Sequence, residues 1–463
     1  NRGMHFVDQA SDWVGELTWD AADNVEVSLS HQVNKFYGTD IGRYYLDYAG
    51  LASNLYYETP FGSEDGLYAL SATTVVEYDN HYEKTDIIAQ ISDVFELPGG
   101  PVDIVVGYEG FDNIYSAQYD KHSEGGYVGG SAGNSGGGSR AVDSYFGEIL
   151  LPVMAGLELN AAVRSDDYDD VGKADSFKVG VLWEGKKGTM VKFNVGEGFR
   201  APTMDTLYGV TTFSANTATD YLACANAGIS QSGCASKQVS TLITSNPNLA
   251  AETSDSTTFS ISQDLGELTP ALNNVSVRLD WYNIEMTDLI SSVSTQDVLY
   301  SDFTDGNLLT NNYEYYASGG LTNDGSAAGA PVGTGTSSTC PTGAAYYKRM
   351  GVSPALYTIR SCANGRIDYV GASYANQGKF EVEGYDFFVD YSVELGGGDL
   401  DFTLEYSHIE DYGGAPFIGS DAHQNNAGFN GAPQNRYNLH LNYTWGDYGI
   451  GVTNRHIGDF AFN

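Results

Sequence analysis

The chain has 463 residues, with 60 acidic against 22 basic side chains and a formal net charge of −38 at pH 7. This charge argues against nucleic-acid binding and against polybasic membrane-surface binding, because both need basic patches. The hydrophobic content of 41% argues against disorder, and no stretch approaches the roughly 20 apolar residues of a spanning helix. The length exceeds the usual prior of about 100–200 residues per domain, so we expect several domains or one large closed architecture.

Apolar and polar residues alternate along much of the chain. In 157–164, Leu157, Leu159, Ala161 and Val163 occupy the odd positions, and polar residues or alanine occupy the even ones. The same period of two recurs in 275–282, 385–394, 400–407 and 436–445. It predicts strands with one apolar and one polar face. Helical periodicity is nearly absent, and only 200–209 is a candidate for a short helical turn.

Short and long connections between these strands also alternate. Short turns are predicted at 20–24, 96–100, 152–156, 184–188, 264–274, 395–399 and 446–447. Longer stretches lie at 36–82, 116–139, 166–175, 200–252, 291–378 and 412–434. An antiparallel meander with all its short turns at one end gives this order, which is typical of a transmembrane β-barrel with long extracellular loops. Seven short turns join about fourteen strands, and strand-like 66–79 is interpreted as an extension above the membrane.

In such a barrel the two faces of each strand have different surroundings. We expect the apolar face to meet lipid and the polar face to line a wet or plugged lumen; the polar set is Glu158, Arg164, Arg278, Asp390, Glu405, Arg436 and His440. Aromatic girdles at the two interfaces are predicted at Trp19, Tyr108, Trp183, Trp281, Tyr406, Tyr443 and Trp445. The alternative is a soluble sandwich or propeller. A propeller would show a repeat of fixed period, and a sandwich rarely carries such long loops beside so many tight turns.

The four cysteines lie in polar loop stretches as two local pairs, Cys224/Cys234 and Cys340/Cys362. Four cysteines allow three connectivities, which sequence does not distinguish. Local pairing is the simplest interpretation, because each bond would staple one long loop. Disulfides point to an oxidising compartment; free thiols are the alternative.

Several sequence motifs follow one another in an order that resembles a known protein family. Glu148-Ile-Leu-Leu-Pro152 is followed by Arg164-Ser-Asp166-Asp-Tyr168-Asp-Asp170, then Gly198-Phe-Arg200-Ala-Pro202, Leu207-Tyr208 and Asn246-Pro-Asn-Leu-Ala-Ala-Glu252. In this order they resemble the barrel of the TonB-dependent outer-membrane receptors, most specifically in 141–290. The resemblance implies an all-β fold, a barrel of about 22 strands, of which 1–463 would be a part. The family's plug domain and TonB box are not recognisable here, so we expect both, and further strands, to lie outside this sequence.

The resemblance implies active transport across the outer membrane of a Gram-negative bacterium. A scarce nutrient, namely a metal chelate, sugar or peptide, would bind at the extracellular loops 200–252 and 291–378 and pass inward when TonB displaces the plug. The implied partners are outer-membrane lipid and lipopolysaccharide and, through the absent N-terminal part, the TonB–ExbB–ExbD complex; nucleic acid is not among them. A passive porin is the first alternative, and a soluble acidic β-rich binding protein, adhesin or enzyme is the second.

Candidate ligand-binding residues lie in the long loops and on the polar face. Tyrosine supplies contact area and a hydrogen bond at a low cost in conformational entropy. The candidates are Arg200, Tyr208, Tyr221, Tyr313, Tyr315, Tyr316, Arg436 and His440. Loop-on-loop packing that seals the top is the alternative role for the tyrosines, and a salt bridge across the lumen wall is the alternative for Arg200.

No catalytic residue or cofactor is predicted. The glycine-rich stretch 129–137 matches serine-hydrolase patterns superficially at Ser131 and Ser135, but no strand–serine–helix elbow surrounds them. The histidines show no metal-ligand spacing. Asp166, Asp167, Asp169 and Asp170 offer oxygen ligands for calcium, although without EF-hand spacing, and ordinary solvated charge is the alternative.

Overall fold

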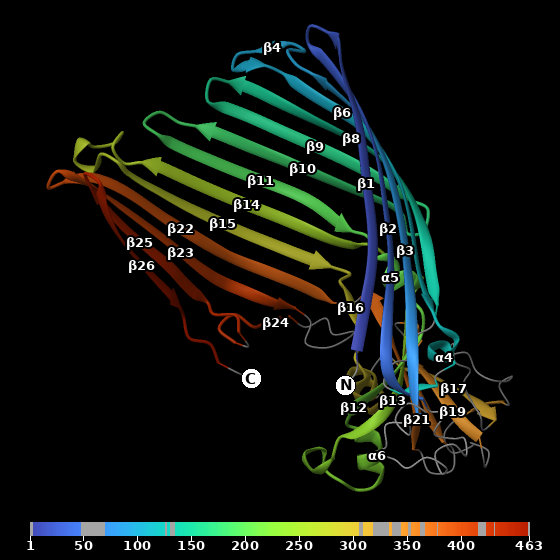
Figure 1. Ribbon diagram of the computed structural model, residues 1–463. Coiled ribbons are helices and arrows are strands. Elements are labelled where there is room, and N and C mark those ends of the chain that lie inside the picture. Colours follow the sequence, from blue (N-terminus) through green and yellow to red (C-terminus); the bar gives the residue numbers. More distant parts are fainter. Residues whose placement is uncertain are drawn as a thin grey trace.

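The computed structural model describes residues 3–47, 70–125, 127–129, 135–304, 309–317, 333–335, 344–350, 353–361, 366–376, 378–414, 423–429 and 431–461. These residues form a large curved antiparallel sheet and a smaller sheet at one end of it (Figure 1). No helix in the described ranges is long and apolar enough to cross a membrane.

Fourteen strands follow one another along the large sheet in chain order. They are β1 (Gly3–Ala22), β2 (Val25–Asp47), β3 (Ser71–Ile91), β6 (Asp103–Tyr119), β8 (Gly136–Met154), β9 (Leu157–Tyr168), β10 (Gly172–Glu184), β11 (Thr189–Arg200), β14 (Glu252–Asp264), β15 (Val275–Thr287), β22 (Lys379–Leu395), β23 (Gly398–Gly414), β25 (Asn435–Trp445) and β26 (Tyr448–Ile457). Short β7 (Val128–Gly129) and β24 (Gln424–Asn425) pair with β2 and β23. Strands β1 and β26 are the two edges of the curved wall in Figure 1.

The predicted meander is confirmed. All seven predicted short turns join consecutive strands at one end of the sheet, and the second of them contains the hairpin β4 (Glu96–Leu97) and β5 (Gly100–Pro101). Gly156 and Gly446 have φ of +79° and +55°, a conformation that glycine adopts without a Cβ clash. The 3-10 helix η2 (Pro270–Leu272) lies in the turn between β14 and β15.

Two predicted boundaries were wrong. The stretch 166–175 is not a long loop, because β9 continues to Tyr168 and β10 starts at Gly172. The described parts of 36–82 are also largely strand, since β2 and β3 remain paired as far as Leu46 and Ser71. The predicted strand character of 66–79 is therefore confirmed where the residues are described, and these two strands extend beyond the others.

The two faces of the wall differ as the alternation predicts. The short helix α5 (Met204–Tyr208) packs on even-numbered residues of β8, and an added Cβ at Gly138 would lie 2.4 Å from the Tyr208 ring. We call this the inner face and the opposite one the outward face. The cross-strand registers place all seven predicted lumen residues on the inner face.

The outward face is apolar and uncovered. Trp19 is 62% exposed and Val163 is 63% exposed, and many other large apolar side chains lie on the same face. A sandwich would bury this face against a second layer, and a propeller would need a blade repeat. The soluble alternatives are therefore wrong for the described residues, and the sheet has the face polarity of a membrane barrel wall.

The two longest connections fold together into a second unit, which we call the cap. Its sheet runs β12 (Thr212–Ala218), β13 (Lys237–Thr244), β21 (Ile367–Asn376), β20 (Ser353–Ser361), β19 (Ala344–Met350), β17 (Leu309–Ala317) and β18 (Gly333–Gly335), with β16 (Ile290–Ser292) beside β21. Its helices are α6 (Tyr221–Asn226), η1 (Gln231–Gly233) and α7 (Thr295–Thr304). A buried cluster that includes Val298, Leu299, Leu356 and Val370 forms its core.

Candidate functional site

A cavity of about 180 Å³ lies where the outer end of the inner face meets the cap. Its walls come from β3, β6, β8, the α5–β12 segment, β13 and β21. We call it the tyrosine pocket, because four of its side chains are tyrosines. The lining residues are Tyr78, Tyr115, Ala117, Tyr119, Gly136, Asp205, Gly209, Val210, Thr212, Ile243, Thr244, Ser245 and Tyr374.

Strand register places three of the tyrosines on one face. Tyr78 is opposite Ala117, Tyr119 is opposite Val76, and Tyr115 is opposite Asn80. Residues opposite each other or two apart in a sheet share a face, so Tyr78, Tyr115 and Tyr119 all point inward. They lie at the cap ends of β3 and β6, where Tyr78 and Tyr115 are the fourteenth and thirteenth residues from the short-turn end, whereas a membrane-spanning strand takes about 9–11 residues. The pocket is thus outside the membrane-spanning segments.

The pocket favours the neutral form of its three tyrosines on β3 and β6. Burial, followed by the neighbouring Tyr119 and Asp40, raises the pKa of Tyr78 to about 12. Burial is also the main reason that the pKa values of Tyr115 and Tyr119 are raised. Asp205 is the charged residue of the lining, and no described lysine, arginine or histidine lines the cavity. At neutral pH the pocket therefore offers aromatic rings, hydroxyl groups and one carboxylate.

A charge network covers the inner wall below the pocket. Arg164 Nη2 donates to Glu109 Oε1 and to Asp166 Oδ1, both at 2.8 Å. Lys84 Nζ lies 2.7 Å from Glu109 Oε2 and 3.0 Å from Asp86 Oδ1. Because these cations and carboxylates compensate one another across β3, β6 and β9, the network is suited to holding the wall rather than a charged ligand.

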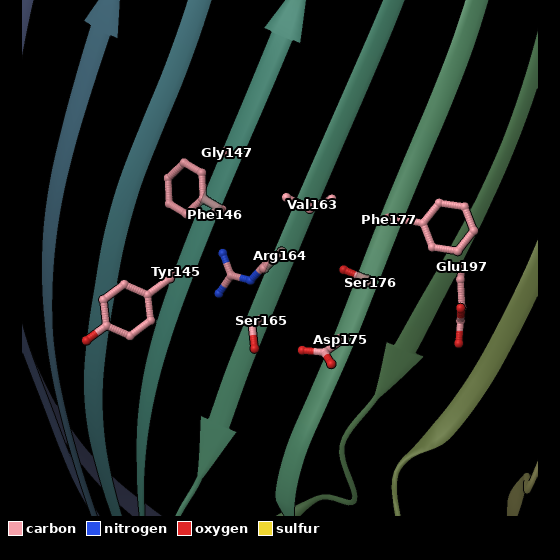
Figure 2. Close-up of a pocket in the computed structure, with 10 residues that line it drawn as sticks. All are labelled: Tyr145, Phe146, Gly147, Val163, Arg164, Ser165, Asp175, Ser176, Phe177 and Glu197. Atoms are coloured by element: carbon pink, nitrogen blue, oxygen red, sulfur yellow. The ribbon is translucent and has the colours of Figure 1, made fainter.

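A larger depression lies elsewhere, on the outward face. It has a volume of about 630 Å³. Figure 2 shows Tyr145 and Phe177 on either side of Val163, with Ser165 and Asp175 along the same strands. The strand registers place all five on the outward face. A depression among the side chains of this face is a feature of the membrane surface and not a candidate ligand site.

Arg200 forms the salt bridge that was the alternative interpretation. It faces Glu252 across β11 and β14, and its Nε and Nη2 both donate to that carboxylate. Glu252 also accepts from the backbone N–H of Ile290 at 2.6 Å. The side chain of Glu252 is 1% exposed and that of Arg200 is 69% exposed. The pair therefore joins β11, β14 and the start of the cap.

The other candidate ligand residues do not gather at one site. Tyr208 lies next to the pocket residue Gly209 and donates to Asp170 at 3.1 Å. Tyr221 instead packs in the cap, with ring centroids 6.2 Å from Tyr300 and 5.8 Å from Phe303. This is the loop-on-loop packing that the sequence left open.

The remaining candidates are farther from the pocket or undescribed. Arg436 and His440 are on the inner face of β25, next to the edge strand β26 and many strands from β3, and His440 Nδ1 is 3.1 Å from Thr453 Oγ1. Tyr313, Tyr315 and Tyr316 are on β17, and their side chains lie outside the described part of the structure.

The four aspartates proposed for calcium are engaged separately. Asp166 binds Arg164 and accepts from Ser144, Asp170 pairs with Arg140, and Asp167 lies 3.4 Å from Lys173. Asp169 accepts from the backbone N–H of Ala141. Within the described ranges no three His, Cys, Asp or Glu side chains are arranged to hold a metal. The calcium interpretation is corrected to a set of ion pairs and hydrogen bonds.

The Cys224–Cys234 disulfide is confirmed, with 5.8 Å between the two Cα atoms. It joins α6 to the residue after η1 inside the cap. Cys340 and Cys362 lie outside the described residues, so their pairing stays a prediction.

The sequence interpretation missed the tyrosine pocket. A signal was present, because Tyr78 and Tyr82, and likewise Tyr115 and Tyr119, are four residues apart and so share a strand face. The other side of the pocket comes from residues such as Asp205, Thr244 and Tyr374, which no local pattern connects with these strands.

A family model described as "TonB dependent receptor-like, beta-barrel" matches residues 2–463. Among solved structures, the RagAB peptide transporter has a TM-score of 0.54 at 11% identity, covering 98% of this chain and 48% of that one. The siderophore receptor PirA from Acinetobacter baumannii has a TM-score of 0.47 at 12% identity, covering 98% of this chain and 60% of that one. The chain thus spans roughly half to three-fifths of the length of these proteins. No curated protein matches the sequence.

Proposed function

Because the chain belongs to the TonB-dependent receptors, whose barrels lie in the outer membrane, we propose that it forms a large part of the wall and outer vestibule of an active nutrient transporter. A nutrient binds in the tyrosine pocket from outside the cell and passes along the inner face. The protein does no covalent chemistry; its role is selective binding, a sealed wall and a passage.

The tyrosine pocket is the observation that carries this proposal. It joins the barrel wall to the cap, so a bound ligand contacts both at once. Concave sites with apolar walls and a few polar groups are the usual form of small-ligand sites. The position at the outer mouth of the inner face is where a ligand entering the lumen is captured.

The remaining parts of the transport cycle come from the family. Lipid and lipopolysaccharide of a Gram-negative outer membrane cover the apolar outward face. A plug domain fills the lumen, and the TonB–ExbB–ExbD complex supplies the force that displaces it. The small ligand belongs to the class of metal chelates, sugars or peptides.

Uptake by cells that express the full-length receptor tests the proposal. Labelled ferric chelates, oligosaccharides and peptides are offered with and without TonB. We expect TonB-dependent uptake of at least one of them, reduced about tenfold in Tyr78→Ala and Tyr119→Ala, because an aromatic contact contributes about 1.5 kcal/mol. Tyr145→Ala is the matched control, since Tyr145 is 62% exposed on the outward face.

The passive porin gives a different result in the same assay. Uptake that continues at full rate without TonB would identify a diffusion channel. TonB-dependent uptake that is unchanged in both pocket variants would remove the pocket from the transport path.

A further inference from the structure

The charges around the tyrosine pocket select against anions. Asp205 lines the cavity, and the charge of nearby Asp40 helps to raise the pKa of the pocket residue Tyr78. An anionic ligand group placed here would meet carboxylates and would find no described cation in the lining. Catecholates, carboxylates and phosphates are therefore poor occupants.

The basic side chains of the inner wall do not make the tyrosine pocket a better site for an anionic ligand. Arg140 donates from Nε to Asp170 at 2.9 Å and from Nη2 to the Pro202 carbonyl oxygen at 2.8 Å. Arg164 and Lys84 are held by the carboxylates of the network below the pocket. Moving any of them to an anionic ligand would break an existing ion pair, which offsets the gain.

Direct coordination of a metal by the tyrosines is also disfavoured. A phenol must lose its proton to act as a strong metal ligand, and the pKa of Tyr78 is raised to about 12. Neutral tyrosines instead present a flat apolar ring and a hydroxyl that both donates and accepts.

The rest of the lining is rich in hydroxyl groups. Thr212, Thr244 and Ser245 lie with Asp205 around the rings. Thr244 Oγ1 is buried and has no hydrogen-bond partner among the described residues. A ligand with its own hydroxyl groups can satisfy such donors and acceptors, whereas an apolar ligand leaves them unpaired.

The dimensions fit one ring of a chain. A volume of about 180 Å³ corresponds to about six water molecules at their share of liquid volume, which is nearer to one sugar ring than to a whole metal chelate. Aromatic side chains continue down the same face, with Tyr82 and Phe111 at a centroid distance of 5.6 Å. Tyr82 is four residues from Tyr78, about 13 Å along the strand, so further rings of a bound chain would meet aromatic surface.

From these observations we propose that the tyrosine pocket binds one ring of a neutral saccharide, and that the following rings of the chain lie against Tyr82 and Phe111 below it. The proposal rests on the proposed transport function and names the ligand class of the same site. Tyrosine faces contact the C–H face of the sugar ring. Asp205 and the pocket hydroxyls bind its hydroxyl groups.

Calorimetric titration of the purified full-length receptor in detergent tests the ligand class. The probes are neutral hexasaccharides of glucose, xylose and N-acetylglucosamine, a galacturonate hexasaccharide, a ferric catecholate and a neutral hexapeptide. We expect a neutral hexasaccharide to bind at least tenfold more tightly than the other three classes. Its affinity should exceed that of the matching disaccharide, because the longer chain reaches Tyr82 and Phe111.

Variants locate the binding. Tyr119→Ala should lower the affinity about tenfold, while Tyr119→Phe keeps the ring and most of the affinity. Asp205→Asn should weaken binding through the lost acceptor, whereas Asp143→Asn on the outward face should leave it unchanged. A preference for the catecholate or the peptide that Tyr119→Ala abolishes would overturn the saccharide assignment and leave the transport proposal standing. Binding of any probe that no pocket variant alters would overturn both.

Discussion

Glu252 holds three segments through one buried carboxylate, which binds Arg200 on β11 and the Ile290 N–H at the start of the cap. Replacing Arg200 with Ala removes the cation and leaves a side chain that is 1% exposed with an uncompensated charge. We expect a loss of about 1–3 kcal/mol in stability. Amide hydrogen exchange should report it as faster exchange at Ile290.

The double variant Arg200→Ala/Glu252→Ala shows how much of the destabilisation comes from leaving the Glu252 carboxylate buried without a partner. It should be less destabilised than Arg200→Ala alone, because the buried charge is gone. Lys173→Ala is the control, since its pair with Asp167 is mostly exposed and contributes little. Equal effects of Arg200→Ala and Lys173→Ala would contradict this role of Glu252.

Tyr78 makes stability depend on alkaline pH. Its folded-state pKa of about 12 lies above the ordinary tyrosine value of 10.0, so the folded state favours the protonated phenol. That contribution is fully present below pH 10 and is lost as the pH rises to about 12. The thermal unfolding temperature of the full-length protein should therefore fall more across this pH window than that of the Tyr78→Phe variant. Parallel curves for the two proteins would refute the raised pKa.

At the residue scale the sequence predicted contacts between two residues better than it predicted the binding pocket. The Arg200 salt bridge was one of two roles that its strand row allowed, and the Cys224–Cys234 pairing followed from the loop that contains both residues. The tyrosine pocket could not be predicted in full, because its lining is assembled from strands near 78 and 115 and from loops near 205, 244 and 374.

Three elements of the cap meet at Arg360 on β20. Its Nη1 lies 2.8 Å from Asp220, the N-cap of α6, and its Nη2 lies 2.7 Å from Asp302 on α7. Burial disfavours the charged guanidinium, but the two carboxylates outweigh that effect and raise the pKa of Arg360 above its ordinary value. The ion pairs therefore fix both helices against the cap sheet.

Replacing Arg360 with Ala should open the cap without unfolding the barrel. The side chain of Asp302 is 1% exposed, and breaking a buried pair costs about 3–5 kcal/mol. Limited proteolysis should then cleave within 200–252 and 291–378 while the heat-modifiable barrel band persists on gels. Lys237→Ala, at an exposed position on β13, is the control. Protease resistance equal to that of the control would exclude this role of Arg360.

At the element scale local sequence patterns predicted the strands and turns correctly, but no pattern predicted the pairing of segments that are far apart in the sequence. Alternation and turn residues predicted the meander, the end of β11 before Pro202 and the start of β14 at Glu252. The parallel pairing of β13 with β21 joins Thr241 to Val370. No sequence period marks a contact between segments so far apart, so the cap was predicted only as two loops.

The whole molecule is organised by the contrast between its two faces. Along β14, Thr257, Phe259 and Ile261 point outward, while Thr258 and Ser260 point inward toward the polar wall. In water the outward face would be a large unprotected apolar surface. In a bilayer hydrocarbon solvates it, and the proposed transport function depends on that placement.

Spin-label accessibility along β14 of the full-length protein in lipid vesicles tests this placement directly. Single labels at 257 to 261 are compared for collisions with dissolved oxygen, which concentrates in hydrocarbon, and with a water-soluble nickel complex. We predict that labels at 257, 259 and 261 favour oxygen and that those at 258 and 260 favour nickel, with a period of two. Equal access of the nickel complex to both sets would contradict a lipid-facing wall and the import function built on it.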